Sequence, residues 1–220
     1  MEGIIIGRMS DNVSIAEAKK IMGENFVGVD ELRQIEELKF SIPNNQPEVK
    51  FSADRLERIK DDYLLILGLS EFEDGSPVTI RNLIKIFGKN PALSEPCFYN
   101  QDWYEKEAFI DIQMENQWFL IKKNVYEESR AVQPGELQKK YIFPSAVRCC
   151  YSFFVTWLSK NTKLFYHDFV WCSDTDHNGD RIYVGKYHDV DGVNNNGFSI
   201  HRHLGLRACY GCVDTELIIR

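Results

Sequence analysis

Two histidines and two cysteines near the end of the sequence have the types and spacing of a zinc site. His201 and His203 are two residues apart, and Cys209 and Cys212 follow in a CxxC motif. A strand over 197–203 would point both imidazoles to one face. Two imidazoles and two thiolates complete a closed tetrahedral zinc site. The alternative needs no cofactor: the histidines form hydrogen bonds on a sheet surface, and the cysteines pack as small apolar side chains.

The same histidines lie near a pair of carboxylates in the sequence. Asp174 and Asp176 precede them in a polar loop, and carboxylates and imidazoles together bind catalytic metal ions. A zinc-dependent hydrolase or nuclease that uses His201 and His203 with Asp174 and Asp176 is therefore the alternative function. Such an enzyme also needs an open coordination position and a general base, which the sequence does not fix.

Other catalytic and metal-binding motifs are weaker. Residues 174–179 match the first half of a calcium-binding loop, but the twelfth position is Gly185 in place of a bidentate glutamate, so a plain turn is favoured. Cys172 and His167 could form a nucleophile pair, although six cysteines and five histidines produce such pairs by chance. The sequence has no phosphate-binding loop, dinucleotide fingerprint, GxSxG or HExxH motif.

Polar loops beside aromatic residues favour a different class, a non-enzymatic recognition protein. The loops at 174–180 and 189–196 are rich in Asp and Asn, and the segment 98–104 is aromatic. Rigid aromatic anchors next to adaptable hydrogen-bonding groups are typical of binding surfaces. The partner is an unknown protein or small molecule. The predicted ligand-binding residues are Trp103, Tyr104, Asp174, Asp176, Asn178, Asn194, Asn195, Asn196 and Arg202.

Composition limits the environment and the partners. The chain has 220 residues, of which 44% are hydrophobic, enough for a substantial core. With 26 basic and 33 acidic side chains, the net charge of −7 argues against nucleic acid as a partner. Ile4–Ile6 is too short for a signal peptide, and no apolar stretch approaches the roughly 18 residues that cross a bilayer. We therefore expect a cytoplasmic protein with reduced thiols and no membrane contact.

Hydrophobic periodicity and capping residues predict an α+β fold. Ser14 begins a helix over 15–22, and Asp30 begins a second over 31–39, so that residues 1–40 form a helical hairpin. A turn-rich linker at 41–52 separates it from an α+β domain over 53–220. A mixed centre carries helices at 53–62 and 80–87, strands at 63–69 and 118–121 and a polar helical segment around 124–130.

The C-terminal half is predicted to be β-rich and built around one buried helix. Apart from one narrow polar stripe, every face of the helix at 145–160 is apolar, and Pro144 suits its first position. Strands are expected at 165–172, 181–187, 197–203 and 209–219. A tight turn at His177-Asn178-Gly179-Asp180 should join the first two.

Residues 143–209, about a third of the chain, resemble C-type-lectin-like domains of the formylglycine-generating-enzyme type. The matching pieces are Phe143-Pro144-Ser145-Ala146, Val170-Trp171-Cys172-Ser173-Asp174, and 192–200 running into Arg202 and Leu206-Arg207. The catalytic cysteines of the oxidase branch have no counterpart here, so the resemblance does not imply oxidation. It implies that residues 143–220 form a loop-rich scaffold whose polar loops bind a ligand.

Overall fold

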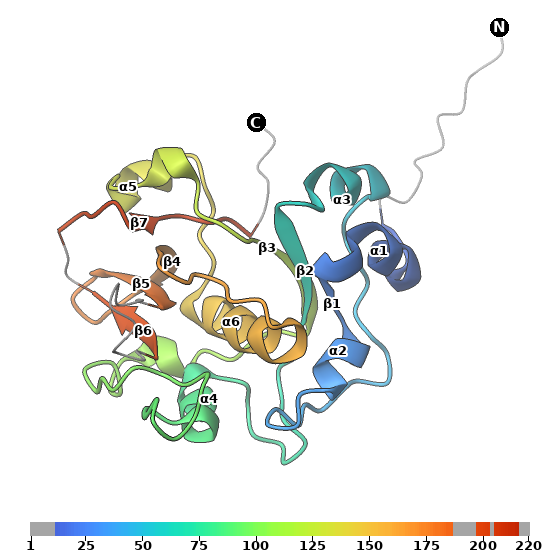
Figure 1. Cartoon of the computed structure of the whole chain (residues 1–220), viewed down its shortest axis with the longest axis horizontal. Coiled ribbons are helices and arrows are strands. Elements are labelled where there is room, and N and C mark those ends of the chain that lie inside the picture. Colours follow the sequence, from blue (N-terminus) through green and yellow to red (C-terminus); the bar gives the residue numbers. More distant parts are fainter. Residues whose placement is uncertain (1–11, 187–196, 203–204, 216–220) are drawn as a thin grey trace, which may run out of the picture.

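Helix α6 (Ala146–Lys160) lies at the centre of the molecule and contacts strands of two separate β-sheets (Figure 1). The computed structural model describes residues 12–186, 197–202 and 205–215. Every residue of α6 from Cys149 to Thr156 is buried, including the two central members of its polar stripe, Ser152 and Thr156. The predicted α+β class and the predicted central helix are both confirmed.

The first sheet has the strand order β1-β2-β3. Its middle strand, β2 (Tyr63–Gly68), is buried along its whole length, as expected of a continuous apolar run. Strand β3 (Gln117–Lys122) pairs with β2 in antiparallel fashion, and the short β1 (Phe26–Val27) pairs with it in parallel. Because β1 follows directly on the first helical segment, the N-terminal residues are built into this sheet.

The second sheet has the order β6-β5-β4-β7 and contains the polar hairpin. Strands β4 (Phe169–Thr175), β5 (Arg181–Lys186) and β6 (Phe198–His201) are antiparallel neighbours, whereas β7 (Tyr210–Gly211) runs parallel to β4. The predicted tight turn between β4 and β5 is confirmed, with Gly179 at a φ of 86°. Of the predicted strand at 209–219, the described part forms only β7, because after Gly211 the carbonyls of Cys212 and Asp214 accept hydrogen bonds from Tyr126 and Lys122 instead of from β4, and residues 216–219 lie outside the described residues.

Three helices have the predicted positions because local capping determines where they begin. The side chains of Ser14, Ser52 and Thr79 accept hydrogen bonds from backbone N–H groups in the first turns of the helices that follow. These helices are α1 (Ile15–Met22), α3 (Ala53–Ile59) and α4 (Ile80–Phe87). In α6 the N-cap is Ser145, so Pro144 precedes the cap and does not occupy the first helical position.

Two predicted helical segments are wrong in extent. Helix α2 covers only Val29–Arg33, and the chain then continues in three-residue turns, with N–H···O bonds from Ile35 to Leu32 and from Leu38 to Ile35. These apolar residues recur every three positions, which suits three-residue turns better than the 3.6-residue period of an α-helix. At 124–130 only the 3-10 turn η3 (Glu127–Ser129) forms. A short helix, α5 (Pro134–Leu137), was not predicted.

One apolar core extends across the linker at 41–52. It includes Ala18 and Leu32 on one side and α6, β2 and Val213 on the other. A smaller aromatic core lies on the far side of the second sheet and consists of Leu137, Tyr141, Phe143, Phe169, Trp171, Tyr183, Tyr210 and Cys212. Within the described ranges, no helix combines the length and the apolar character required to span a bilayer.

Two glycines test how tightly the second sheet is packed. A Cβ atom on Gly185 in β5 would lie 2.1 Å from the carbonyl oxygen of Asp168, whereas a Cβ on Gly135 in α5 would meet open space. Gly185→Ala should therefore lower the free energy of unfolding by about 2–3 kcal/mol. Gly135→Ala should raise it by up to about 1 kcal/mol through helix propensity. Urea unfolding measures both values, and equal effects of the two changes would contradict this packing.

Candidate functional site

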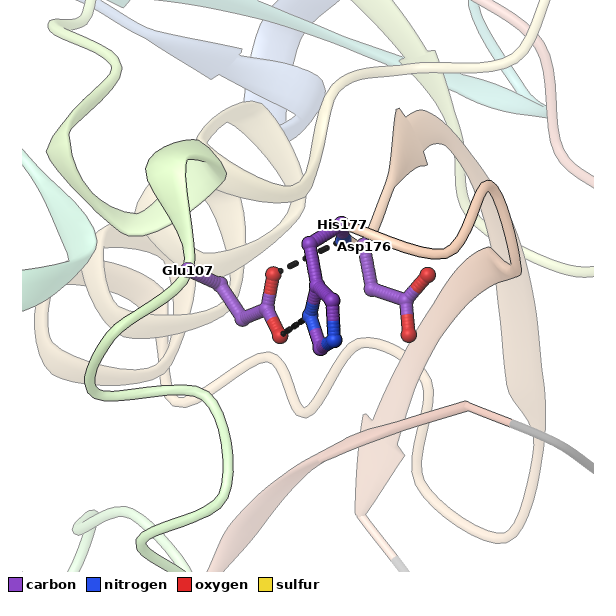
Figure 2. A group of neighbouring side chains, drawn as sticks. All are labelled: Glu107, Asp176 and His177. Atoms are coloured by element: carbon purple, nitrogen blue, oxygen red, sulfur yellow. Dashed lines mark hydrogen bonds and ion pairs between the residues drawn. The ribbon is translucent and has the colours of Figure 1, made fainter.

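Three segments that are distant in the sequence meet in a polar cluster at one end of the second sheet. Trp103 and Glu107 come from the segment before the 3-10 helix η2 (Ala108–Asp111), Asp176 and His177 from the β4–β5 turn, and Arg202 from the end of β6. We call these five residues the Arg202 cluster. Figure 2 shows Glu107 reaching across to the turn that carries Asp176 and His177.

Glu107 holds the imidazole of His177 in a fixed orientation. Its Oε1 lies 2.6 Å from His177 Nδ1, and its Oε2 accepts a 3.0 Å hydrogen bond from the backbone N–H of the same residue (Figure 2). Glu107 is only 6% exposed, whereas the side chain of His177 is 66% exposed. A carboxylate at Nδ1 fixes the proton on that nitrogen, so that Nε2 is the atom available to a ligand.

Arg202 joins the two carboxylates and the aromatic segment. Its Nη1 donates hydrogen bonds to Asp176 Oδ2 at 2.5 Å and to Glu107 Oε1 at 3.3 Å. Its guanidinium carbon lies 4.5 Å from the ring centroid of Trp103, a cation–π distance. The indole N–H of Trp103 in turn donates to the carbonyl of Ile200 at 3.1 Å, so the ring cannot swing away without losing that bond.

Asp176 is the enclosed anchor of the cluster. Its side chain has no exposed surface, and its Oδ1 accepts hydrogen bonds from the backbone N–H groups of Asn178 and Asp180 at 2.9 and 2.8 Å. Burial acts to raise the pKa of Asp176. Hydrogen bonds from the backbone of Asp180, from Arg202 and from the backbone of Asn178, together with the charge of Arg202, outweigh burial and hold this pKa below its ordinary value. Asp176 is therefore an ionised partner for Arg202.

A metal ion is the obvious candidate ligand for this group. Ligand atoms of Glu107, Asp176 and His177 all lie within 4.8 Å of one another. However, both oxygens of each carboxylate already accept hydrogen bonds, and Arg202 supplies the positive charge that a cation would bring. A metal ion would have to displace Arg202 from the two carboxylates. The arrangement instead fits a set of polar groups that satisfy one another and present His177 outward.

The predicted zinc ligands do not come together in the described part of the chain. Atoms of His201, Cys209 and Cys212 do not all lie within 4.8 Å of one another, and His203 lies outside the described residues. His201 stacks on Tyr183, and burial lowers its pKa. Burial raises the pKa of Cys212 to about 12, which opposes the thiolate that zinc requires. A zinc site on all four residues stays a prediction.

Asp174 and Tyr104 have positions that the sequence did not indicate. Asp174 Oδ2 accepts a 2.6 Å hydrogen bond from the backbone N–H of Ala146, so this carboxylate caps the N-terminus of α6, and burial raises its pKa. It does not share a partner with Asp176. Tyr104 is completely buried in the main core. Neither side chain is placed to meet a ligand on the surface of the Arg202 cluster.

The remaining sequence-predicted residues divide clearly. Trp103, Asp176 and Arg202 do come together, and Asn178 is exposed beside them at the tip of the turn. Asn194, Asn195 and Asn196 lie outside the described residues. Cys172, the thiol of the nucleophile pair considered from the sequence, is buried. Burial raises its pKa well above the ordinary value for a thiol, which disfavours an attacking thiolate.

Sequence reasoning missed Glu107 and His177 as site residues. His177 is adjacent to Asp176 in a recognisable turn, and this proximity was an available signal. Glu107 is 70 positions away from His177 and lies in no motif. Comparison with protein families, with characterised proteins and with solved structures finds no match to this chain.

The ion pair of Asp176 predicts a specific pH dependence. Asp176→Asn keeps an oxygen for the two backbone N–H groups but removes the charge facing Arg202, and should destabilise the protein by about 2 kcal/mol near neutral pH. The pKa of Asp176 in the folded protein is below its ordinary value of 3.8. Its contribution to the free energy of unfolding is therefore present above about pH 3.8 and is lost as the pH falls through the lower pKa of the folded protein. Urea unfolding at several pH values measures the difference. A difference that grows on acidification would contradict the ion pair.

Arg202 should also control access of metal ions. In Arg202→Ala, Asp176 Oδ2 and Glu107 Oε1 lose their guanidinium partner, and two carboxylates and an imidazole face one another. This variant should bind Zn²⁺ at least about tenfold more tightly than the unmodified protein in calorimetric titrations. Adding His177→Ala should reverse the gain. Equal affinity of the unmodified protein and Arg202→Ala would show that Arg202 does not occupy a cation position.

Proposed function

We propose that this chain is a non-enzymatic recognition protein that binds its ligand on the surface of the Arg202 cluster. The observation that carries the proposal is the 2.6 Å contact between Glu107 and His177 Nδ1, which fixes an exposed imidazole on a buried carboxylate. Side chains that are already ordered lose little entropy on binding, and such preorganisation favours affinity. Trp103 and Arg202 form the rigid neighbouring surface.

The chemistry around the cluster favours recognition over catalysis. Five of the six cysteines are buried, and the sixth, Cys209, has its pKa raised by burial. The alternative zinc hydrolase draws no support from the carboxylates, because Asp174 caps α6 while Asp176 pairs with Arg202. The resemblance to a lectin-like scaffold is consistent with binding through polar loops, since the β4–β5 turn is one of those loops.

Charge and hydrogen-bonding capacity indicate the kind of group that fits. The cluster sets two carboxyl groups against one guanidinium, and Nε2 is the ring nitrogen of His177 that Glu107 does not engage. A group that donates hydrogen bonds, such as an ammonium or an amide on a partner protein or a small molecule, therefore suits the surface better than an anion.

A photocrosslinking experiment tests this surface directly. Replacing Asn178 with p-benzoylphenylalanine places a crosslinker next to His177, and the same replacement of Lys139, an exposed residue that follows α5, is the matched control. In lysate, position 178 should give a discrete adduct that position 139 does not give. Adding His177→Ala to the Asn178 variant should reduce the yield by about tenfold.

Two outcomes would contradict the proposal. One is an adduct whose yield is unchanged by His177→Ala, because recognition would then not involve the imidazole. The other is the same set of adducts from both positions, which indicates random collision. Circular dichroism of each variant verifies that a lost adduct does not reflect a lost fold.

A further inference from the structure

The last described residues of the chain form a strap that connects the two sheets. We use this name for residues 210–215. Tyr210 and Gly211 pair with β4 of the second sheet, and the carbonyl of Asp214 accepts a hydrogen bond from the N–H of Lys122 in β3 at 3.3 Å. Between them, the carbonyl of Cys212 accepts from the N–H of Tyr126 at 3.0 Å. The side chain of Asp214 also contacts the first sheet, through the hydroxyl of Tyr63 in β2.

Three side chains, those of Tyr63, Tyr126 and Asp214, form a closed ring of oxygen–oxygen contacts at this position. The hydroxyl oxygens of Tyr63 and Tyr126 are 2.7 Å apart. Oδ1 of Asp214 lies 2.7 Å from Tyr63 Oη, and Oδ2 of Asp214 lies 3.1 Å from Tyr126 Oη. Each of these contacts is short enough to be a hydrogen bond, and each needs one hydrogen between its two oxygens.

The two tyrosine hydroxyls carry too few hydrogens for the three contacts of the ring. Each hydroxyl carries one hydrogen, so an ionised Asp214 leaves one of the three contacts with lone pairs facing lone pairs. A protonated carboxyl resolves this. Tyr63 donates to Tyr126, Tyr126 donates to Asp214 Oδ2, and Asp214 Oδ1 donates to Tyr63. Every oxygen then has a matched partner.

The charged groups around the ring do not replace this proton. Lys122 Nζ lies 5.3 and 5.0 Å from the ring centroids of Tyr63 and Tyr126, over their faces, and its ion-pair contact is with Asp62 at 3.9 Å. Asp214 itself makes no ion pair within 4.0 Å in the part of the chain that the structure describes. Asp214 is 3% exposed, so water does not solvate an ionised carboxylate there.

The other titratable groups near the ring belong to the neighbouring elements. Tyr141 stacks on Tyr126 and donates its hydroxyl to Glu128, with Lys140 nearby. Cys212 lies on the strap itself, and its raised pKa keeps it a neutral thiol. Burial, as the largest influence, raises the pKa of Asp214, although the two tyrosine hydroxyls and the charge of Lys122 act in the opposite direction.

We propose that Asp214 keeps its carboxyl proton in the folded protein at pH values where exposed aspartates are ionised, and that this proton is a pH-sensitive latch on the strap. Loss of the proton leaves the ring one hydrogen short and weakens the attachment of residues 210–215 to the first sheet. This inference is independent of the Arg202 cluster and concerns a different part of the molecule.

The direction of the pH effect follows from linkage. A carboxyl group whose pKa is raised on folding stabilises the protein fully below its unfolded pKa, near 3.8, and this contribution is lost as the pH rises through the folded value. Asp214→Asn provides the reference, because its amide can accept from Tyr126 and donate to Tyr63 at every pH. The unmodified protein should therefore lose stability relative to Asp214→Asn as the pH rises.

The experiment compares urea unfolding of the two proteins from about pH 4 to about pH 9. Hydrogen exchange of the strap amides, taken as the ratio between the two proteins at each pH, reports detachment of the strap. We expect the exchange rate of the unmodified protein, divided by that of Asp214→Asn, to rise at least about threefold over the same pH interval. Glu128→Gln is the matched control, since it replaces an exposed carboxylate that accepts from a tyrosine hydroxyl but whose pKa is lowered.

Infrared spectroscopy detects the carboxyl proton of Asp214 directly. With ¹³C-labelled aspartate, the difference spectrum between the unmodified protein and Asp214→Asn should show a carboxylic-acid carbonyl band above pH 3.8 that disappears at higher pH. The subtraction removes the contribution of Asp174, whose pKa is also raised by burial. Absence of that band, or parallel stability profiles of the two proteins, would overturn the proposal. A profile for Glu128→Gln with the same trend as Asp214→Asn would overturn it as well, because the effect would then not belong to Asp214.

Discussion

The complete burial of α6 is the constraint on which the rest of the structure depends. Eight consecutive buried residues leave this helix no solvent face over two turns, so other elements must cover it on every side. The hydroxyl of Tyr151 donates to the carbonyl of Leu67 in β2, and the ring of Phe153 packs 4.4 Å from that of Phe198 in β6. The two sheets therefore pack against the helix between them, and residues 210–215 provide a second connection from β4 to β3.

The position of the Arg202 cluster follows from this packing. Asp174 caps the first turn of α6 and so fixes the end of β4, two residues before Asp176. Phe198 begins β6 against α6, and four residues later the same chain supplies Arg202. Both partners of the central ion pair are thus positioned by contacts with one helix. Trp103 completes the arrangement by bonding to Ile200 of β6.

The sequence predicts those features that depend on neighbours along the chain. Caps at Ser14 and Thr79, the apolar run of β2 and the turn at Gly179 are local signals, and each element they predict is present. Strand β1 has only two residues and depends on parallel pairing with β2, so it has no local signal. Glu107 is a site residue only because folding brings it into contact with His177, which is 70 positions later in the sequence. Residue types and their spacing along the chain do not reveal such long-range contacts.

Three aspartates illustrate why residue type alone does not assign a role. Asp176 faces backbone N–H groups and a guanidinium, which favour the charged form. Asp214 faces two hydroxyls that must share hydrogens with it, and burial favours its neutral form. Asp174 faces a helix N-terminus. Acid therefore acts on the Arg202 cluster and alkali on the strap, because donor chemistry, and not the carboxyl group itself, decides which protonation state the fold requires.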